Sequence, residues 1–102
     1  MSLTVIANVY AKFEKVDVVK AELEKLAEAT SRVEGCISYA MHQNHHNPAH
    51  FIFYENWKDR ETWENNSRAF HSDEYRKATE GAIEDFVVNE MSQLPPRKRR
   101  GV

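Results

Sequence analysis

Aromatic side chains are concentrated in residues 51–59, which read FIFYENWKD. The period-two alternation of a strand puts Phe51, Phe53, Glu55 and Trp57 on one face. Aromatic rings at this density could line a pocket for a flat aromatic ligand, or they could fill the core. From the pattern alone, the core interpretation is favoured.

Two polar residues, Asn8 and His42, lie within segments that are predicted to be strands. A buried polar side chain needs a hydrogen-bond partner or a function. Each residue could bond a neighbouring backbone group, or could act on a ligand held between the sheet and the helices.

Metal binding, nucleotide binding and nucleophilic catalysis find little support. The segment HHNPAH contains His45, His46 and His50, but their spacing matches no zinc pattern, so we expect a polar hairpin tip and no metal. Cys36 is the single cysteine and is typical of a small buried hydrophobe. The sequence lacks the glycine-rich loops that hold phosphates or dinucleotides.

The elements that position these residues follow the order β-α-β-β-α-β. The predicted strands are residues 3–13, 36–44, 50–57 and 86–94, and the predicted helical segments are residues 16–35, 60–70 and 73–83. Gly35 is expected to end the first helix, and Asp59 and Ser72 are expected to cap the later segments. This order predicts a ferredoxin-like α+β fold, with both helical layers on one face of an antiparallel sheet.

The 102 residues suit one domain, which we place at residues 1–94, followed by a basic and flexible tail at residues 95–102. The tail contains RKRR without interleaved aromatic residues, so we expect no nucleic-acid partner. We find no long apolar run and no signal peptide, so we expect no membrane partner. A single cysteine agrees with a cytoplasmic location.

The sheet face without helices is expected to be too apolar for contact with water. We assign Ile52, Tyr54, Val5 and Val9 to this face. Exposed apolar patches of this kind mark interaction surfaces. We therefore expect a second copy of the chain to cover it, giving a homodimer.

Residues 26–63, LAEATSRVEGCISYAMHQNHHNPAHFIFYENWKDRETW, resemble the antibiotic biosynthesis monooxygenase family, which includes quinol monooxygenases. The motifs that carry the resemblance are Thr30, Glu34-Gly35, Tyr39 and YENW at residues 54–57. The likeness extends over residues 3–94. It implies a dimeric α+β barrel made from two ferredoxin-like units.

The resemblance also implies an oxidation that uses no flavin, haem or metal cofactor. An electron-rich phenol or hydroquinone is deprotonated, and its anion passes an electron to O₂. Matching positions imply that Trp57 stacks on this small aromatic substrate and that His42 or His71 accepts the proton. Arg76 and Asn8 would stabilise the oxyanion. The remaining predicted substrate-binding residues are Phe53, Tyr39, Trp63 and Tyr75.

The sequence departs from the family pattern in several places. Phe53 stands where polyketide-type members have Asn, and Trp63 replaces a helical Tyr. Asn65-Asn66 occupies the place of the Ala-His pair of many quinol-type members, and His71 is a candidate replacement for that histidine. The Trp and His of haem-degrading relatives have no clear match, so haem is not expected.

Two other functions stay open from the sequence. The same fold includes an isomerase of a phosphorylated autoinducer-2 signal, whose basic C-terminus after a proline is similar to PPRKRR here. A non-catalytic module that binds a small ligand is the third possibility, because a fold does not fix a function. Oxygen consumption distinguishes a monooxygenase from both.

Overall fold

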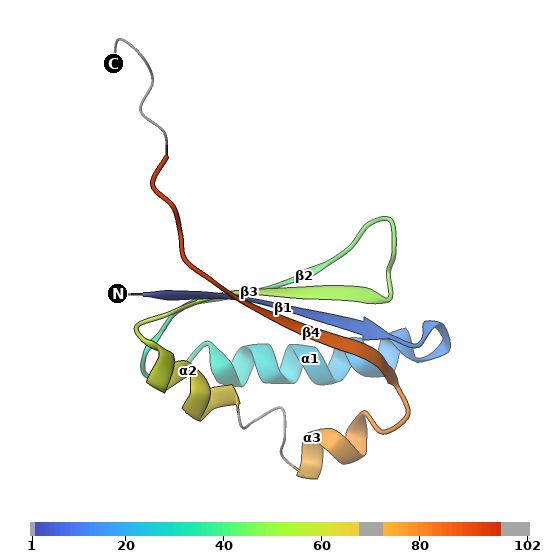
Figure 1. The fold of residues 1–102 in the computed structure, drawn as a ribbon. Coiled ribbons are helices and arrows are strands. Elements are labelled where there is room, and N and C mark those ends of the chain that lie inside the picture. The colour runs from blue at the N-terminus through green and yellow to red at the C-terminus, as the bar shows by residue number, and fades with distance from the viewer. Residues whose placement is uncertain (1, 68–72, 97–102) are drawn as a thin grey trace.

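A computed structural model describes residues 2–67 and 73–96 and shows one four-stranded antiparallel sheet with helices packed against it (Figure 1). The elements are β1 (Leu3–Ala11), the 3-10 turn η1 (Phe13–Lys15), α1 (Val16–Thr30), β2 (Cys36–Gln43), β3 (His50–Trp57), α2 (Arg60–Ser67), α3 (Asp73–Ala78) and β4 (Ile83–Met91). The strand order is β2-β3-β1-β4. This confirms the predicted ferredoxin-like α+β fold.

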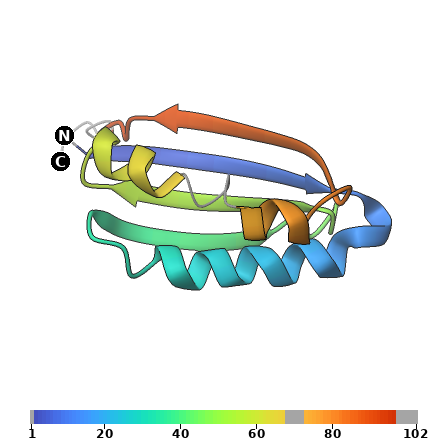
Figure 2. The same ribbon diagram turned by 90° about the horizontal axis from the view of Figure 1, so that it is seen from below.

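The molecule has two layers, because α1, α2 and α3 all lie on the same side of the sheet (Figures 1 and 2). Within the described ranges, the other face of the sheet carries no helix. We call this second face the outer face. None of the helices described here has the length and apolar character needed to cross a bilayer.

Helix α1 packs on the sheet through the apolar stripe that the sequence predicts. Val19, Leu23 and Thr30 are buried at steps of four and seven residues. Val19 and Leu23 belong to the same core cluster as Phe51 and Phe53 of β3, which are fully buried. This cluster forms the core, because one helix face and one sheet face are removed from water together.

Gly35 has a different role from the one expected. Helix α1 ends at Thr30, and Gly35 lies five residues later in the turn before β2. Its φ of 93° suits glycine, and an added Cβ would lie 2.6 Å from Cγ2 of Thr62 in α2. Its carbonyl oxygen accepts a hydrogen bond of 2.7 Å from the Lys58 amide. Gly35 therefore lets α2 approach the sheet closely.

The strand register corrects one assignment of sequence analysis. Val5 pairs with Glu55 and Val9 pairs with Phe51, and all four side chains point toward the helices. Val5 and Val9 are fully buried there and do not lie on the outer face.

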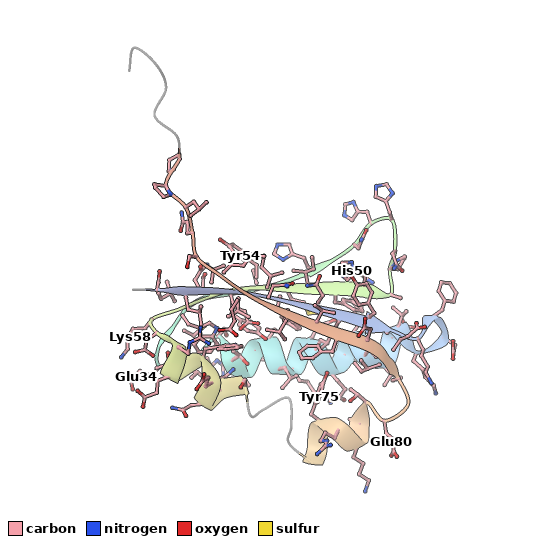
Figure 3. The ribbon with its side chains drawn as sticks, viewed as in Figure 1. Glu34, His50, Tyr54, Lys58, Tyr75 and Glu80 are labelled. Carbon is pink, nitrogen blue, oxygen red and sulfur yellow. The ribbon has the colours of Figure 1, made fainter. Side chains whose placement is uncertain are left out.

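The side chains assigned correctly to the outer face come from β3. Ile52 and Tyr54 alternate with the buried residues of that strand, and Tyr54 is 43% exposed. Figure 3 shows Tyr54 and His50 on the side of the sheet opposite the helices. The outer face is therefore partly apolar, as predicted, but less so than the first assignment suggested.

The last strand begins earlier than predicted. It spans residues 83–91 rather than 86–94, and the helical segment before it ends at Ala78. A turn closed by the hydrogen bond from the Ala82 amide to the Thr79 carbonyl, with Gly81 at a φ of 70°, stops that helix. A register shift at Tyr10/Ala11 then allows Ala11 to pair with Ile83. Ser72, the expected cap, lies outside the described residues.

Candidate functional site

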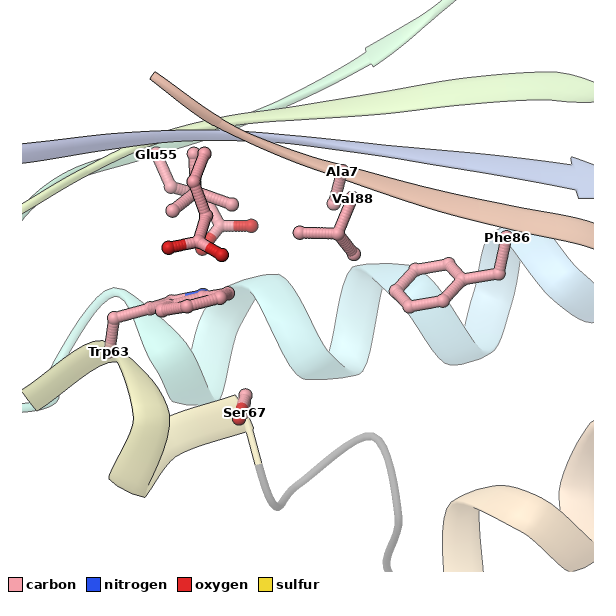
Figure 4. A pocket seen from close by; sticks show the side chains of 8 residues that line it. Ala7, Glu55, Trp63, Ser67, Phe86 and Val88 are labelled. Carbon is pink, nitrogen blue, oxygen red and sulfur yellow. The ribbon is translucent and has the colours of Figure 1, made fainter. Parts of the chain in front are cut away.

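A pocket of about 270 Å³ lies between the sheet and α2. Its walls come from the helix-side faces of β1, β3 and β4 and from one side of α2. Figure 4 shows the Trp63 ring below Glu55, with Val88 and Phe86 further along the sheet. The lining residues are Val5, Ala7, Glu55, Trp63, Ser67, Phe86, Val88 and Glu90.

The pocket opens at the edge of the sheet. Strand β4 is an edge strand, so its helix-side residues are covered on one side only. Phe86 and Val88 are 41% and 38% exposed, although both face the helices. Most of the wall is therefore apolar and accessible, as in sites for small organic ligands.

One row of paired residues brings ionisable groups to this pocket. Tyr39 of β2 pairs with Glu55 of β3, Glu55 pairs with Val5 of β1, and Val5 pairs with Glu90 of β4. Adjacent strands lie about 4.8 Å apart, so the backbones at Glu55 and Glu90 are separated by roughly 10 Å. Two carboxyl groups thus flank Val5 at the same end of the pocket.

Glu55 is the most unusual residue of the pocket, because it is an acid with only 3% of its surface exposed. Its Oε1 accepts a hydrogen bond of 2.8 Å from the indole Nε1–H of Trp57. Burial raises the pKa of Glu55 to about 7, and the bond from Trp57 opposes part of that rise. The carboxyl group can therefore exchange a proton near neutral pH.

Glu90 is held by an ion pair with Arg60, which reaches across from the first turn of α2. Arg60 also approaches Glu64 at 4.0 Å.

The start of α2 is fixed by Asp59, whose Oδ1 accepts hydrogen bonds of 2.9 Å from the amide and the hydroxyl of Thr62. The bond from the Thr62 amide is the main reason that the pKa of Asp59 is lowered. This confirms the predicted helix cap.

Among the predicted substrate-binding residues, Trp63 lines the pocket. Trp57 and Phe53 are fully buried and do not line the pocket. The Phe53 ring contacts the Tyr39 ring at a centroid distance of 5.1 Å. The Trp57 ring does not line the pocket, but its indole N–H donates a hydrogen bond to Glu55, which does.

The two predicted tyrosines lie in the core layer. The Tyr39 hydroxyl is buried close to Thr30 without a well-formed hydrogen bond, and burial followed by the charge of Glu55 raises its pKa. Tyr75 of α3 packs against the main core, and burial raises its pKa to about 12. Both phenols stay protonated at neutral pH.

Three of the predicted catalytic residues, Asn8, His42 and Arg76, do not line this pocket. Asn8 of β1 and His42 of β2 both pair with Ile52 of β3, one from each side. They therefore point to the outer face, as Ile52 does. Asn8 Oδ1 bonds His50 Nε2 at 3.0 Å, and His42 is exposed. Arg76 is exposed on α3, and His71 lies outside the described residues.

The histidines of the β2–β3 hairpin also form no metal site. Asn44 Oδ1 accepts the amide hydrogens of His46 and Asn47 at 2.8 and 3.3 Å, which shapes the turn. In the part of the chain that the structure describes, no three His, Cys, Asp or Glu side chains are grouped to hold a metal ion.

Sequence reasoning missed Glu55 as a site residue, although a signal was present. Strand parity places this acid on the same face as Phe53 and Trp57, and a charge among buried aromatic residues is unusual. Phe86, Val88 and Glu90 gave no comparable signal, since their faces depend on the β4 register.

Comparison with known proteins identifies related sequences and folds. A family model described as antibiotic biosynthesis monooxygenase matches residues 2–81. A solved structure named as an antibiotic biosynthesis monooxygenase is 26% identical, with a TM-score of 0.77, and the match covers 91% of this chain and 99% of that one. No curated protein matches the chain significantly.

Two further solved structures share the fold at lower identity. A Pseudomonas aeruginosa protein is 22% identical with a TM-score of 0.79, and the match covers 92% of this chain and 95% of that one. A conserved protein from Methanosarcina mazei is 24% identical with a TM-score of 0.75, and coverage is 92% and 94%. The fold is thus shared over nearly the whole length of each protein.

Proposed function

The chain belongs to the antibiotic biosynthesis monooxygenase family, and we propose that it oxidises a quinol-like or polycyclic phenolic substrate with O₂ without a cofactor. The observation that carries this proposal is the apolar pocket beside β4, which holds a buried carboxyl group. Its wall of Val5, Ala7, Val88 and Phe86 suits a flat, largely apolar molecule.

The pocket contributes an apolar surface that binds the substrate in this reaction. Trp63 lies where it can contact the face of an aromatic ring, and such contacts add about 0.5–1.5 kcal/mol beyond the buried area. An apolar wall also strengthens every polar contact made inside it, because the local dielectric constant is low.

The chemistry balances without an external reductant. For a hydroquinone, one atom of O₂ enters the ring and the other leaves as water, while the ring becomes a hydroxyquinone. The substrate supplies all the electrons. We therefore expect the purified protein to show no flavin or haem absorption, and such a spectrum in the native protein would contradict the cofactor-independent proposal.

Oxygen uptake is the direct test of this function. Hydroquinones, anthrones and sugar phosphates are supplied in turn to the purified protein in an oxygen electrode, with autoxidation measured in buffer alone. We expect O₂ and one phenolic substrate to disappear in equal amounts, with no build-up of hydrogen peroxide. Rates equal to autoxidation for every phenol would contradict the proposal. Binding without turnover would then favour a ligand-binding module.

The proposal includes a homodimer in the cytoplasm. The outer face has no covering element among the described residues and exposes Tyr54, Val87 and Met91. A second copy would bury these side chains. The single cysteine agrees with a reducing compartment.

A further inference from the structure

We propose that Glu55 is the proton acceptor of this pocket, and that the pocket selects phenolic substrates that enter without a negative charge. This inference rests on the proposed function, since it assigns a role within that oxidation. It differs from the roles that sequence analysis gave to His42 and His71.

The geometry of Glu55 suits a proton acceptor. The residue is buried and lines the pocket, so its carboxyl group can meet a bound molecule without first meeting bulk water. Oε1 is fixed by the indole of Trp57 at 2.8 Å. Within the described residues, the carboxyl group makes no second hydrogen bond. An acceptor needs one oxygen within hydrogen-bond reach of the substrate hydroxyl.

The groups around Glu55 leave the pocket without a surplus positive charge. On β2 its neighbours are Tyr39, which pairs with it, and Cys36. Both carry no charge at neutral pH, because burial and then the charge of Glu55 raise the pKa of each. On β4 it faces Glu90, whose charge is matched by Arg60 of α2. Val5 of β1 and Trp63 of α2 add apolar surface.

This balance of charge determines which substrates fit. An anion would meet the carboxylate of Glu55, which is buried, so that its repulsion is only weakly screened by water. A neutral phenol meets no such barrier. The same argument disfavours the phosphorylated substrate of the isomerase alternative, because a phosphate needs free cationic or amide donors.

The proton transfer conserves charge inside the pocket. The substrate O–H bond breaks and its proton moves to Glu55, so one negative charge is exchanged for another on the phenolate. O₂ adds to a ring carbon of the phenolate, and Glu55 returns its proton to the outer oxygen of the peroxide. The O–O bond then breaks as the same ring carbon loses its hydrogen as a proton and becomes a carbonyl, and that second proton completes the water that leaves. Burial raises the pKa of Glu55 to about 7, which suits both the uptake and the return.

The test compares Glu55→Gln with the wild type and with Glu24→Gln, a control at an exposed position on α1. The Gln side chain keeps the acceptor for Trp57 but cannot take the proton. We expect kcat/KM for a hydroquinone to fall about 10²–10⁴-fold in Glu55→Gln, with binding of the quinone product within about threefold of wild type. The wild-type rate should rise with pH and level off above about 7, and this step should vanish in Glu55→Gln.

A second variant keeps the test decisive if Glu55→Gln does not fold. Trp57→Phe removes the hydrogen bond that lowers the pKa of Glu55, so the midpoint of the pH–rate profile should move upward.

The charge selectivity is tested with hydroquinone and hydroquinone sulfonate, and we expect at least a tenfold lower kcat/KM for the sulfonate.

The outcomes separate this inference from the proposed function. If the wild type is active and Glu55→Gln is equally active with the same pH–rate profile, then Glu55 is not the proton acceptor, while the proposed function still stands. Equal use of the sulfonate would overturn the charge selectivity. A wild type that oxidises no phenol would overturn both the inference and the proposed function.

Discussion

At the scale of single residues, Glu55 should make the stability of the protein depend on pH. Its pKa rises from an ordinary value of 4.5 to about 7 on folding, so the folded state binds the proton more tightly than the unfolded chain. Protonated Glu55 therefore stabilises the folded state. Its contribution to the free energy of unfolding is fully present below about pH 4.5 and is lost as pH rises through about 7.

Substitution by glutamine tests this dependence. Near pH 8, Glu55→Gln should be more stable than wild type by on the order of 1–3 kcal/mol, because one pKa unit corresponds to about 1.4 kcal/mol. The gap should close toward pH 4.5. Urea denaturation at a series of pH values measures it, with Glu24→Gln as the exposed control. A gap that stays constant with pH would show that Glu55 titrates normally.

The two tryptophans should separate folding from ligand binding. Trp57 is fully buried, so Trp57→Ala should cost roughly 3–5 kcal/mol of stability. Trp63 is half-buried on the pocket wall, so Trp63→Ala should cost about 1 kcal/mol or less and weaken quinone binding roughly tenfold. Thermal unfolding and equilibrium titration check the pair. Normal stability of Trp57→Ala with lost binding would restore Trp57 as the ligand-stacking residue.

The residue types of the site were only partly predictable. Trp63 was found from its position in the family pattern, and the inward direction of Glu55 follows from strand parity. The burial of Glu55 depends on Val5, fifty positions away in the sequence, and on how α2 places Trp63 against the sheet. Strand parity indicates the direction of the side chain, but it does not show which residues cover it, and the proton-acceptor role was therefore assigned to His42 or His71.

At the scale of elements, Gly35 controls how closely α2 approaches the sheet. A methyl group at this position would lie within 2.6–2.8 Å of three side-chain atoms of Thr62 and would also strain the backbone at a φ of 93°. We expect Gly35→Ala to lower the free energy of unfolding by roughly 2 kcal/mol or more. It should also weaken ligand binding, because α2 carries Trp63.

Gly81 provides a matched control for that prediction. It also has a positive φ, of 70°, but an added Cβ there meets nothing within 4 Å. Gly81→Ala should therefore show backbone strain alone, on the order of 1 kcal/mol. The difference between the two variants in urea denaturation measures the contact with Thr62. Equal losses would show that α2 moves aside without cost.

The sequence predicted elements well where the local pattern was strong. The alternation HFIFYENW gave β3 its observed bounds, Asp59 caps α2, and the apolar stripe of α1 faces the sheet. The prediction of the bounds of β4 was wrong, because the start of that strand depends on a register shift in its pairing with β1. Such a shift arises from pairing between distant segments and leaves no local signature.

At the scale of the whole molecule, the outer face combines apolar and polar groups. Tyr54, Val87 and Met91 are exposed on it. Next to them, the Tyr10 and His50 rings stack at 4.3 Å, and Asn8 bonds His50 and Asn89. Apolar side chains supply affinity at an interface, and a fixed polar network supplies register. Both are present on one sheet face.

We therefore expect a two-fold symmetric dimer that buries on the order of 2,000 Å² or more in total, with the outer faces together. Sedimentation at micromolar concentration should give twice the chain mass of 11.9 kDa. Tyr54→Glu should shift the protein toward monomer, because a buried charge without a partner is costly. Val18→Glu, at an exposed site on α1, should leave the dimer intact. A wild-type monomer, or equal dissociation of both variants, would mean that the outer face is not the interface.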